Sequence, residues 1–246
     1  MIPRKIHYCW FGRKPLPESA LKCIESWKKY LPDYEIVEWN EDNFDVSSVQ
    51  YIKQAYETGK YAFVSDYARF WVLYNFGGLY FDTDVEVIRP MDDIIAEGPF
   101  MGCELSLSDA VNVAPGLGIG AVPGMEIFRE LLKLYEGMSF VNPDGTLNKT
   151  TVVKITTDLL ERDGFVPEDR TQRCYGLNIY PVEYFCPLHY RTGKCTITGN
   201  TRTIHHYAAT WHDSKDRLAV LKRRIFSETQ IKAISAFLDK FRRCKK

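Results

Sequence analysis

The sequence predicts an α/β fold with a mostly parallel sheet, and the start of the chain supplies the main evidence. Residues 5–11 (KIHYCWF) are aromatic and β-branched and run into Gly12, which is typical of a strand that ends in a turn. Apolar residues then recur at helical spacing between Pro17 and Pro32, and residues 34–39 alternate as a second strand. A strand, a helix and a strand in this order predict a βαβ unit, whose two strands are parallel.

The rest of the chain continues this pattern without a clear domain boundary. Further helices are expected at 47–59, 65–75, 125–135, 151–162 and from 214 onward, and further strands at 79–81 and 85–88. Ser65 is a suitable N-cap for the helix that Gly77-Gly78 would end. Residues 102–124 and 174–207 are expected to form loops with short strands. We expect one large domain, 1–213, followed by a helical tail, 214–246, that packs on it or extends from it.

The composition is that of an ordinary globular protein and excludes several classes. Lys and Arg number 32, and Asp and Glu also number 32, which argues against binding of nucleic acid through bulk charge. The chain has no apolar run of about 18 residues. Its start, MIPRKIHYCWFG, lacks the apolar stretch of a signal peptide, so we expect it in the cytosol. Seven cysteines without a C-x-x-C pair argue against a disulfide framework or a cysteine-zinc site.

Asp82-Thr83-Asp84 follows a predicted strand and is the only Asp-x-Asp in the sequence. Two carboxylates this close repel each other, so a site that keeps both ionised usually holds a cation. Oxygen ligands suit Mg²⁺ or Mn²⁺, which commonly join protein carboxylates to substrate phosphates. The simpler interpretation is a pair of solvated turn aspartates. The position favours a site, because α/β proteins bind ligands at the carboxyl ends of parallel strands.

Asp66 and Arg69 lie three residues apart on a predicted helix just upstream and therefore share a face. Such a face can present a carboxylate to a ribose or sugar hydroxyl and a guanidinium to a phosphate. The alternative is a local ion pair, which contributes little to stability, and spacing alone favours that alternative.

The string from Ser65 to Asp84 reads S-D-x-x-R followed by G-G-x-Y-x-D-x-D. It resembles the DXD sugar-binding region of glycosyltransferase family 32, which includes bacterial capsular and surface-polysaccharide transferases, yeast mannosyltransferases and α1,4-galactosyltransferases. Residues 2–12 and 34–43 are also similar to the first two strands of that family. The resemblance covers roughly the first hundred residues and a short C-terminal patch. It implies a GT-A fold of the nucleotide-diphospho-sugar transferase type, with a central, mostly parallel sheet flanked by helices.

The resemblance implies a divalent metal, Mn²⁺ or Mg²⁺, held by Asp82 and Asp84. Residues 203–211 (TIHHYAATW) are similar to the I-H-H-x-x-x-S-W ending of the family, in which a histidine completes the metal site. A nitrogen ligand among oxygens favours Mn²⁺. Neighbouring residues of a strand point to opposite faces, so only one of His205 and His206 is expected to reach the metal easily, and the match to the strand end of the family favours His205.

The resemblance also implies which residues bind the nucleotide-sugar. Trp10 is expected to stack on the base, and Trp211 to lie near the leaving phosphate. Asp66, Arg69 and Tyr80 are expected to contact the donor. Without the resemblance, a core position is the better interpretation of a lone tryptophan.

The glycine-rich stretch 114–120 (APGLGIG) is not a phosphate loop, because no Lys-Ser/Thr follows it and G-x-G-x-G is a weak signal. We expect it to form a flexible wall near the donor sugar and the acceptor.

The tail from Lys215 to Lys246 is basic and amphipathic, with eleven Lys and Arg against three Asp and Glu. One interpretation is a peripheral contact with anionic lipid at the inner face of the cell membrane, where a lipid-linked acceptor would lie. A solvated terminal helix is an equally good interpretation.

The function expected from these features is metal-dependent transfer of a sugar from a nucleotide-sugar to a hydroxyl of a glycan or lipid-linked saccharide. By family habit the donor is a UDP-sugar, the anomeric configuration is retained, and the product is a capsular or surface polysaccharide. Asp66, Arg69, Asp82 and Asp84 are expected to carry catalysis. One alternative is a metal-independent glycoside hydrolase with paired carboxylates, which leaves the S-D-x-x-R block unexplained. The other is a non-catalytic module that binds nucleotide-sugars or glycans.

Overall fold

The structure, a computed structural model, describes residues 1–208. Trp211 and the tail 214–246 lie outside the described residues. Within residues 1–208, none of the helices combines the length and the apolar character that crossing a membrane requires.

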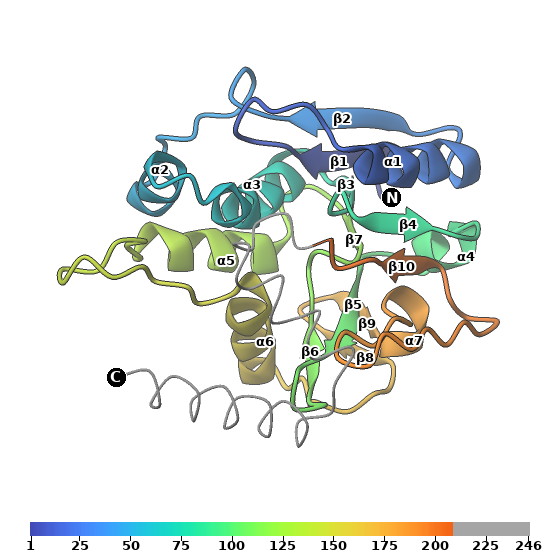
Figure 1. Ribbon diagram of the computed structural model, residues 1–246. Helices are drawn as coiled ribbons and strands as arrows, with labels where there is room; N and C mark the ends of the chain where they lie inside the picture. The colour runs from blue at the N-terminus through green and yellow to red at the C-terminus, as the bar shows by residue number, and fades with distance from the viewer. Residues whose placement is uncertain (209–246) are drawn as a thin grey trace, which may run out of the picture.

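The described residues form seven helices and ten strands, and the chain begins with the order strand, helix, strand, as drawn in Figure 1. The helices are α1 (Glu18–Tyr30), α2 (Gln50–Glu57), α3 (Tyr61–Phe76), α4 (Asp92–Ala96), α5 (Glu126–Glu136), α6 (Val152–Arg162) and α7 (Val182–Phe185). The strands are β1 (Lys5–Cys9), β2 (Glu35–Trp39), β3 (Gly78–Tyr80), β4 (Val85–Val87), β5 (Phe100–Leu105), β6 (Val111–Val113), β7 (Ile119–Ala121), β8 (Gln172–Cys174), β9 (Leu177–Tyr180) and β10 (Thr203–His205).

The main sheet has the strand order β2-β1-β3-β7-β5-β9-β8, and β6 pairs with β5 beside it. Strand β1 is parallel to β2 and to β3, and β5 is parallel to β9. Strand β7 is antiparallel to both of its neighbours, β3 and β5, so these two point the same way. Strands β2, β1, β3, β5 and β9 therefore share one direction, while β6, β7 and β8 oppose it. The mostly parallel central sheet expected from the sequence is confirmed.

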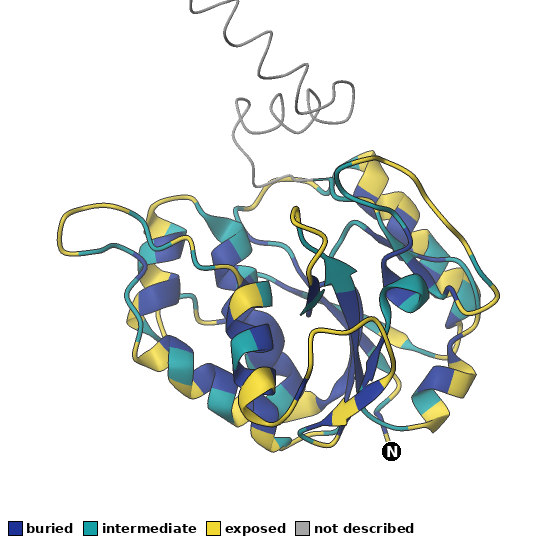
Figure 2. Cartoon of the chain, turned by 90° about the horizontal axis from the view of Figure 1, so that it is seen from below, coloured by how far each residue is buried: buried dark blue, intermediate teal, exposed yellow. Residues whose placement is uncertain are grey.

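Helices cover both faces of this sheet, and the side chains of β1 alternate between the two cores. Ile6 and Tyr8 pack with Trp27 of α1, whereas Cys9 joins a core that contains Tyr67 of α3. In Figure 1, α2, α3, α5 and α6 lie on one side of the sheet and α1, α4 and α7 on the other. Figure 2 shows the sheet strands as mostly buried and the outer helix faces as exposed.

Helix α3 begins earlier than the sequence suggested. It starts at Tyr61, so the expected N-cap Ser65 lies inside the helix, where its Oγ donates to the Tyr61 carbonyl oxygen at 3.2 Å. The physical reason is the apolar first turn, in which Phe63 and Val64 are buried. Gly77 ends the helix as expected, with a φ of 62° that favours glycine.

The glycine-rich segment is a packed part of the core and not the flexible wall that we expected. Residues 114–121 are all buried, and their last part is strand β7, which lies between β3 and β5. A Cβ on Gly120 would lie 2.2 Å from the ring of Phe100. Glycine is therefore required here for close packing of backbone against an aromatic ring.

A second sheet of two strands brings the C-terminal patch back to the middle of the chain. Strand β10 pairs antiparallel with β4, which places His205 opposite Val85. Figure 1 shows β10 beside β4. Because Val85 directly follows Asp84, this pairing brings a histidine from the end of the described chain to the acidic pair.

Candidate active site

The acidic pair lies at the carboxyl edge of the parallel strands. Strands β1 and β3 are parallel neighbours, so Trp10, which follows β1, and Asp82, which follows β3, belong to the same edge. The Asp82 amide donates to the carbonyl oxygen of Gly116 at 3.0 Å, which ties the turn to the segment before β7. This is the edge at which an α/β sheet binds its ligand.

Buried groups hold the carboxylate of Asp82 from one side. Arg69 Nη1 donates to Oδ2 at 3.3 Å, and Arg69 Nη2 lies 3.2 Å from Oδ1. The Tyr80 hydroxyl donates to Oδ1 at 3.0 Å. The side chain of Asp82 is 29% exposed, so the carboxylate is fixed by its neighbours and still accessible.

Arg69 lies beneath the site and not on its surface. The residue is 3% exposed, its Nη2 donates to Asp66 Oδ1 at 2.8 Å, and its Nε donates to the Ser65 carbonyl oxygen at 3.2 Å. The guanidinium also lies over the ring of Tyr80, with its central carbon 5.0 Å from the ring centroid. The local ion pair that spacing favoured is therefore present, and it is buried.

The protonation states of Asp66 and Arg69 follow from their burial and from the ion pair between them. Burial opposes the charge of Arg69, but Asp82 and Asp66 raise its pKa above the ordinary value, so it stays protonated. Burial raises the pKa of Asp66 to about 7, although Arg69 lowers it. Arg69 and Tyr80 are thus placed to position Asp82, and Asp66 is held by Arg69 in turn.

Asp84 meets the histidine that comes from the far end of the described chain. His205 Nε2 lies 3.3 Å from Asp84 Oδ1, and the Ala208 amide donates to Oδ2 at 2.8 Å. Burial by itself raises the pKa of Asp84, but His205 and the amide outweigh it and lower the pKa to about 2. Burial opposes the charge of His205, and Asp84 nevertheless raises its pKa well above the ordinary value.

The structure separates the two adjacent histidines. His206 Nε2 lies 2.8 Å from Glu86 Oε2, and both side chains are exposed. Its ring is therefore turned away from the aspartates, while its amide donates to the Asp84 carbonyl oxygen at 2.9 Å. Of the two histidines, His205 is the one brought to the acidic pair, as neighbouring strand positions require.

Trp10 borders an open pocket of about 440 Å³ at the ends of β1 and β2. Its indole Nε1 donates to the Lys14 carbonyl oxygen at 2.6 Å, which fixes the ring plane. The residues that line the pocket are Trp10, Arg13, Lys14, Pro15, Glu38, Asn40, Glu41 and Asp42. An aromatic face beside charged and amide groups suits a nucleoside, whose base is flat and whose ribose is polar.

Two contacts of the site were not predicted from the sequence. A Cβ on Gly116 would lie 2.0 Å from Asp82 Oδ2, so glycine is needed there for the carboxylate to keep its place. The second contact is that of Glu104 on β5 with Tyr207, which lies two residues after His205. The Tyr207 hydroxyl donates to Glu104 Oε2 at 3.5 Å. Burial raises the pKa of Glu104, and His205 opposes this. The glycine-rich run pointed to the segment of Gly116 but not to the carboxylate it packs against.

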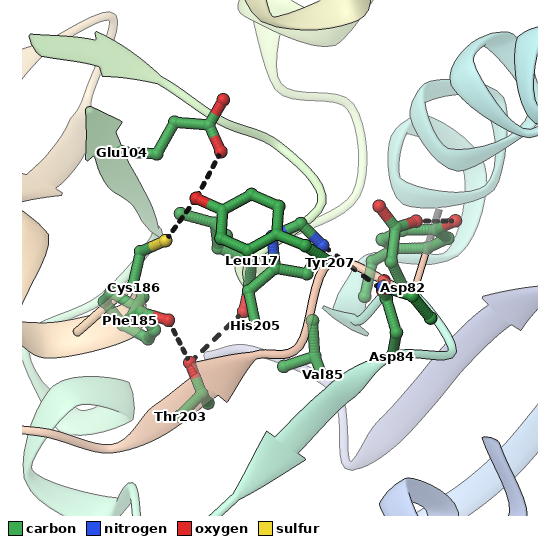
Figure 3. Close-up of polar contacts among 12 residues, drawn as sticks. Asp82, Asp84, Val85, Glu104, Leu117, Phe185, Cys186, Thr203, His205 and Tyr207 are labelled. Carbon is green, nitrogen blue, oxygen red and sulfur yellow. Dashed lines mark hydrogen bonds and ion pairs between the residues drawn. The ribbon is translucent and has the colours of Figure 1, made fainter. Parts of the chain in front are cut away.

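Asp84 and His205 are in contact and offer a carboxylate oxygen and an imidazole nitrogen, which are ligand types that a divalent cation accepts (Figure 3). Among the described residues, Asp82 does not join these two in a group of ligand atoms that all lie within 4.8 Å of one another, so its carboxylate would have to turn toward them to share an ion. Hard oxygen ligands suit Mg²⁺ and Mn²⁺, and the nitrogen shifts the preference toward Mn²⁺. Asp84 is ionised at neutral pH, as an ordinary aspartate is, and its contacts with His205 and the Ala208 amide lower its pKa to about 2.

Comparisons with known proteins find similarity to glycosyltransferases. Residues 17–101 match the family described as "Glycosyltransferase sugar-binding region containing DXD motif". Inositol phosphoceramide mannosyltransferase 1 of Schizosaccharomyces pombe is 26% identical over 107 residues, which are 41% of this chain and 33% of that protein. The chain thus spans about a third of the length of this relative. Uncharacterized glycosyltransferase L373 of Acanthamoeba polyphaga mimivirus is 24% identical over 213 residues, which cover 84% of this chain and 82% of that protein.

A solved structure shares the architecture. PaToxG glycosyltransferase aligns with a TM-score of 0.50 and 19% identity, covering 66% of this chain and 70% of that one. The expected GT-A fold is confirmed, and the resemblance to the DXD glycosyltransferases is confirmed over residues 17–101.

Proposed function

We propose that this chain, which contains the DXD sugar-binding region of a glycosyltransferase family, transfers a sugar from a nucleotide-sugar to a hydroxyl of a glycan acceptor. The observation that carries the proposal is the meeting of His205 with Asp84 at 3.3 Å, at the sheet edge that also holds Asp82. A pair of solvated turn aspartates would have no reason to recruit a histidine from the end of the described chain.

Asp82, Asp84 and His205 are the residues that would hold Mn²⁺, or Mg²⁺ in its place. When bound, the ion supplies Lewis-acid stabilisation of the charge that develops on the departing diphosphate. The protein prepares for this charge by keeping Asp84 ionised and by holding Asp82 with the buried Arg69 and Tyr80. Preorganised ligands need no rearrangement during the reaction, which is the usual source of electrostatic catalysis.

The base of the nucleotide is proposed to stack on Trp10 in the open pocket beside β1 and β2. A UDP-sugar is the donor that we propose. The pocket lies at the same edge of the sheet as Asp82, so base and diphosphate occupy neighbouring parts of one surface.

We further propose that the transfer retains the anomeric configuration. The leaving phosphate would take the proton of the attacking acceptor hydroxyl on the same face, through an oxocarbenium-like transition state. Mass spectrometry of protein quenched during turnover tests this, because a glycosyl adduct on a side chain would contradict the same-face route.

The acceptor that we propose is a glycan or a lipid-linked saccharide of a capsular or surface polysaccharide. The basic tail 214–246, outside the described residues, would place the enzyme at anionic lipid on the cytoplasmic side. Sedimentation with anionic and neutral vesicles tests this, and equal partition of full chain and a 1–213 variant would contradict it.

The test of the activity is a panel of nucleotide-sugars incubated with the protein and Mn²⁺, with and without EDTA. We expect one donor to release free nucleotide, faster with an acceptor, and EDTA to stop the release. Release of sugar from a glycoside with no metal requirement would instead identify a hydrolase. Tight donor binding without turnover would identify a binding module.

A further inference from the structure

A second group of metal-ligating side chains lies behind His205, on the side away from Asp84 (Figure 3). Glu104 comes from β5, Cys186 directly follows α7, and His205 ends β10. One ligand atom of each of these three lies within 4.8 Å of the other two. We propose that Glu104, Cys186 and His205 form a binding site for a thiophilic divalent ion, Zn²⁺, which shares the ring of His205 with the site of the two aspartates but uses its other nitrogen.

The two nitrogens of His205 face different surroundings. Nε2 lies 3.3 Å from Asp84 Oδ1, which leaves Nδ1 for the opposite side of the ring. Nδ1 is a fully buried polar atom without a hydrogen-bond partner in the described part of the chain. A buried polar atom left unpaired costs about 1–3 kcal/mol, so native structures rarely keep one without a use. A metal ion on the Nδ1 side satisfies this atom.

The other two ligands are joined by the hydroxyl of Tyr207. Cys186 Sγ lies 3.0 Å from Tyr207 Oη, and the same hydroxyl donates to Glu104 Oε2 at 3.5 Å. The Tyr207 ring lies against the imidazole of His205, with ring centroids 4.2 Å apart. The phenol therefore covers the three ligands and sits where the ion would bind. A thiol is a weak hydrogen-bonding group, so little is lost when the phenol turns aside.

The chemistry of the three ligands selects zinc over the metals of the aspartate pair. Thiolate is a soft ligand that Zn²⁺ accepts and Mg²⁺ and Mn²⁺ do not favour. Zinc bonds of about 2.0–2.3 Å place ligand atoms roughly 3.5 Å apart in a tetrahedron, so the cluster needs to contract by about 1 Å. Binding displaces the thiol proton, and the thiolate with the carboxylate of Glu104 then balances the charge of the ion.

Sequence patterns do not show this site, because the ligands come from three distant elements and no C-x-x-C pair is present. Cys186 is 2% exposed, which keeps the thiol from bulk oxidants. The site uses Nδ1 and does not need Asp84, so the two sites can be tested separately.

Cobalt titration of the metal-free full chain tests the proposal, since Co²⁺ replaces Zn²⁺ and gives a near-ultraviolet charge-transfer band only when a thiolate binds it. We expect the band in the wild-type chain and its loss on addition of one equivalent of Zn²⁺. Cys186→Ser should lack the band. Cys195→Ser is the matched control, because Cys195 is exposed and outside the cluster, and it should keep the band.

Two more variants test the site independently of Cys186→Ser. Glu104→Gln should retain the band but weaken Co²⁺ binding by about tenfold or more, which decides the matter if Cys186→Ser does not fold. Asp84→Asn should keep the band while losing the metal-dependent nucleotide release, so this inference and the proposed function can fail independently. A wild-type chain without the band, or a band that survives Cys186→Ser in folded protein, would overturn the proposal.

Discussion

Asp82 and Asp84 are two positions apart, and each contacts a different basic side chain. The carboxylate of Asp82 is held by Arg69, while that of Asp84 faces His205 at 3.3 Å. The sequence pattern predicted the pair as a metal site, because Asp-x-Asp after a strand is a recognisable local signal. The sequence pattern did not predict that Arg69 would be buried and would bond to neighbouring protein groups. Burial depends on which elements pack over a helix face, and a local pattern does not show this.

The neighbouring histidines provide a matched pair of variants. His205→Ala should raise the Mn²⁺ concentration needed for half-maximal nucleotide release by about tenfold or more, because it removes a nitrogen ligand beside Asp84. His206→Ala should change it little, because that ring faces Glu86. Metal titrations of donor turnover measure both. Equal effects of the two substitutions would contradict the assignment of His205.

His7 makes the stability of the fold depend on pH. Its Nε2 lies 3.0 Å from the Gly77 carbonyl oxygen, and Nδ1 accepts from Trp39 Nε1 at 3.1 Å, so the ring must be neutral. Burial lowers its pKa to about 4. The unfolded chain takes up a proton near pH 6.5, so the free energy of unfolding should fall as the pH drops from 6.5 to 4, by about 3 kcal/mol from this residue.

Urea unfolding at pH 7.5 and pH 4.5 measures this effect. His7→Gln removes the titrating group, so the loss of stability between the two pH values should be smaller in this variant by about 2–3 kcal/mol. Identical losses in the variant and the wild-type chain would show that His7 is not the group responsible.

At the level of elements, the sequence predicted the helices and strands whose positions depend on nearby residues. The first strand, helix and strand, and the end of α3 at Gly77, follow from periodicity and from a glycine with positive φ. The stretch 114–120 was expected to form a flexible wall, because a run of glycines looks the same in a sequence whether it is solvated or packed. Its burial comes from contact with residues far along the chain, such as Phe100, which a single-sequence pattern does not show.

Gly116 is the position where this packing meets the site. Gly116→Ala adds a Cβ that would lie 2.0 Å from Asp82 Oδ2, so the carboxylate must move. We expect turnover to fall by about tenfold or more while the fold, followed by circular dichroism, is kept. Gly199→Ala is the control, because a Cβ there meets nothing within 4 Å. Turnover of Gly116→Ala equal to that of this control would show that the carboxylate position is unimportant.

On the scale of the whole molecule, the fold gathers residues from both ends of the described chain at one edge of the sheet. The resemblance predicted the GT-A architecture, the acidic pair and the histidine, because each is marked by a motif. The cluster of Glu104, Cys186 and His205 was not predictable, because its members come from three elements without a shared spacing.

Ligand binding should stabilise the whole chain cooperatively. Mn²⁺ and UDP together should raise the melting temperature by several degrees at about 100 times the dissociation constant, and each alone by less, since the diphosphate and the ion bind each other. Trp10→Ala should reduce the shift caused by UDP with Mn²⁺, because Trp10 borders the pocket proposed for the base. Differential scanning fluorimetry measures these shifts, and an unchanged shift in the variant would place the base elsewhere.

The central claim is that Asp84 helps to hold the ion on which transfer depends. The most direct measurement is the initial rate of nucleotide release from the preferred donor, with Mn²⁺, in Asp84→Asn and in Glu86→Gln. Glu86 is the matched control, because it faces His206 and not the acidic pair. We expect the rate to fall by at least about 100-fold in Asp84→Asn and to stay near the wild-type value in Glu86→Gln. A folded Asp84→Asn protein with the wild-type rate would contradict the account.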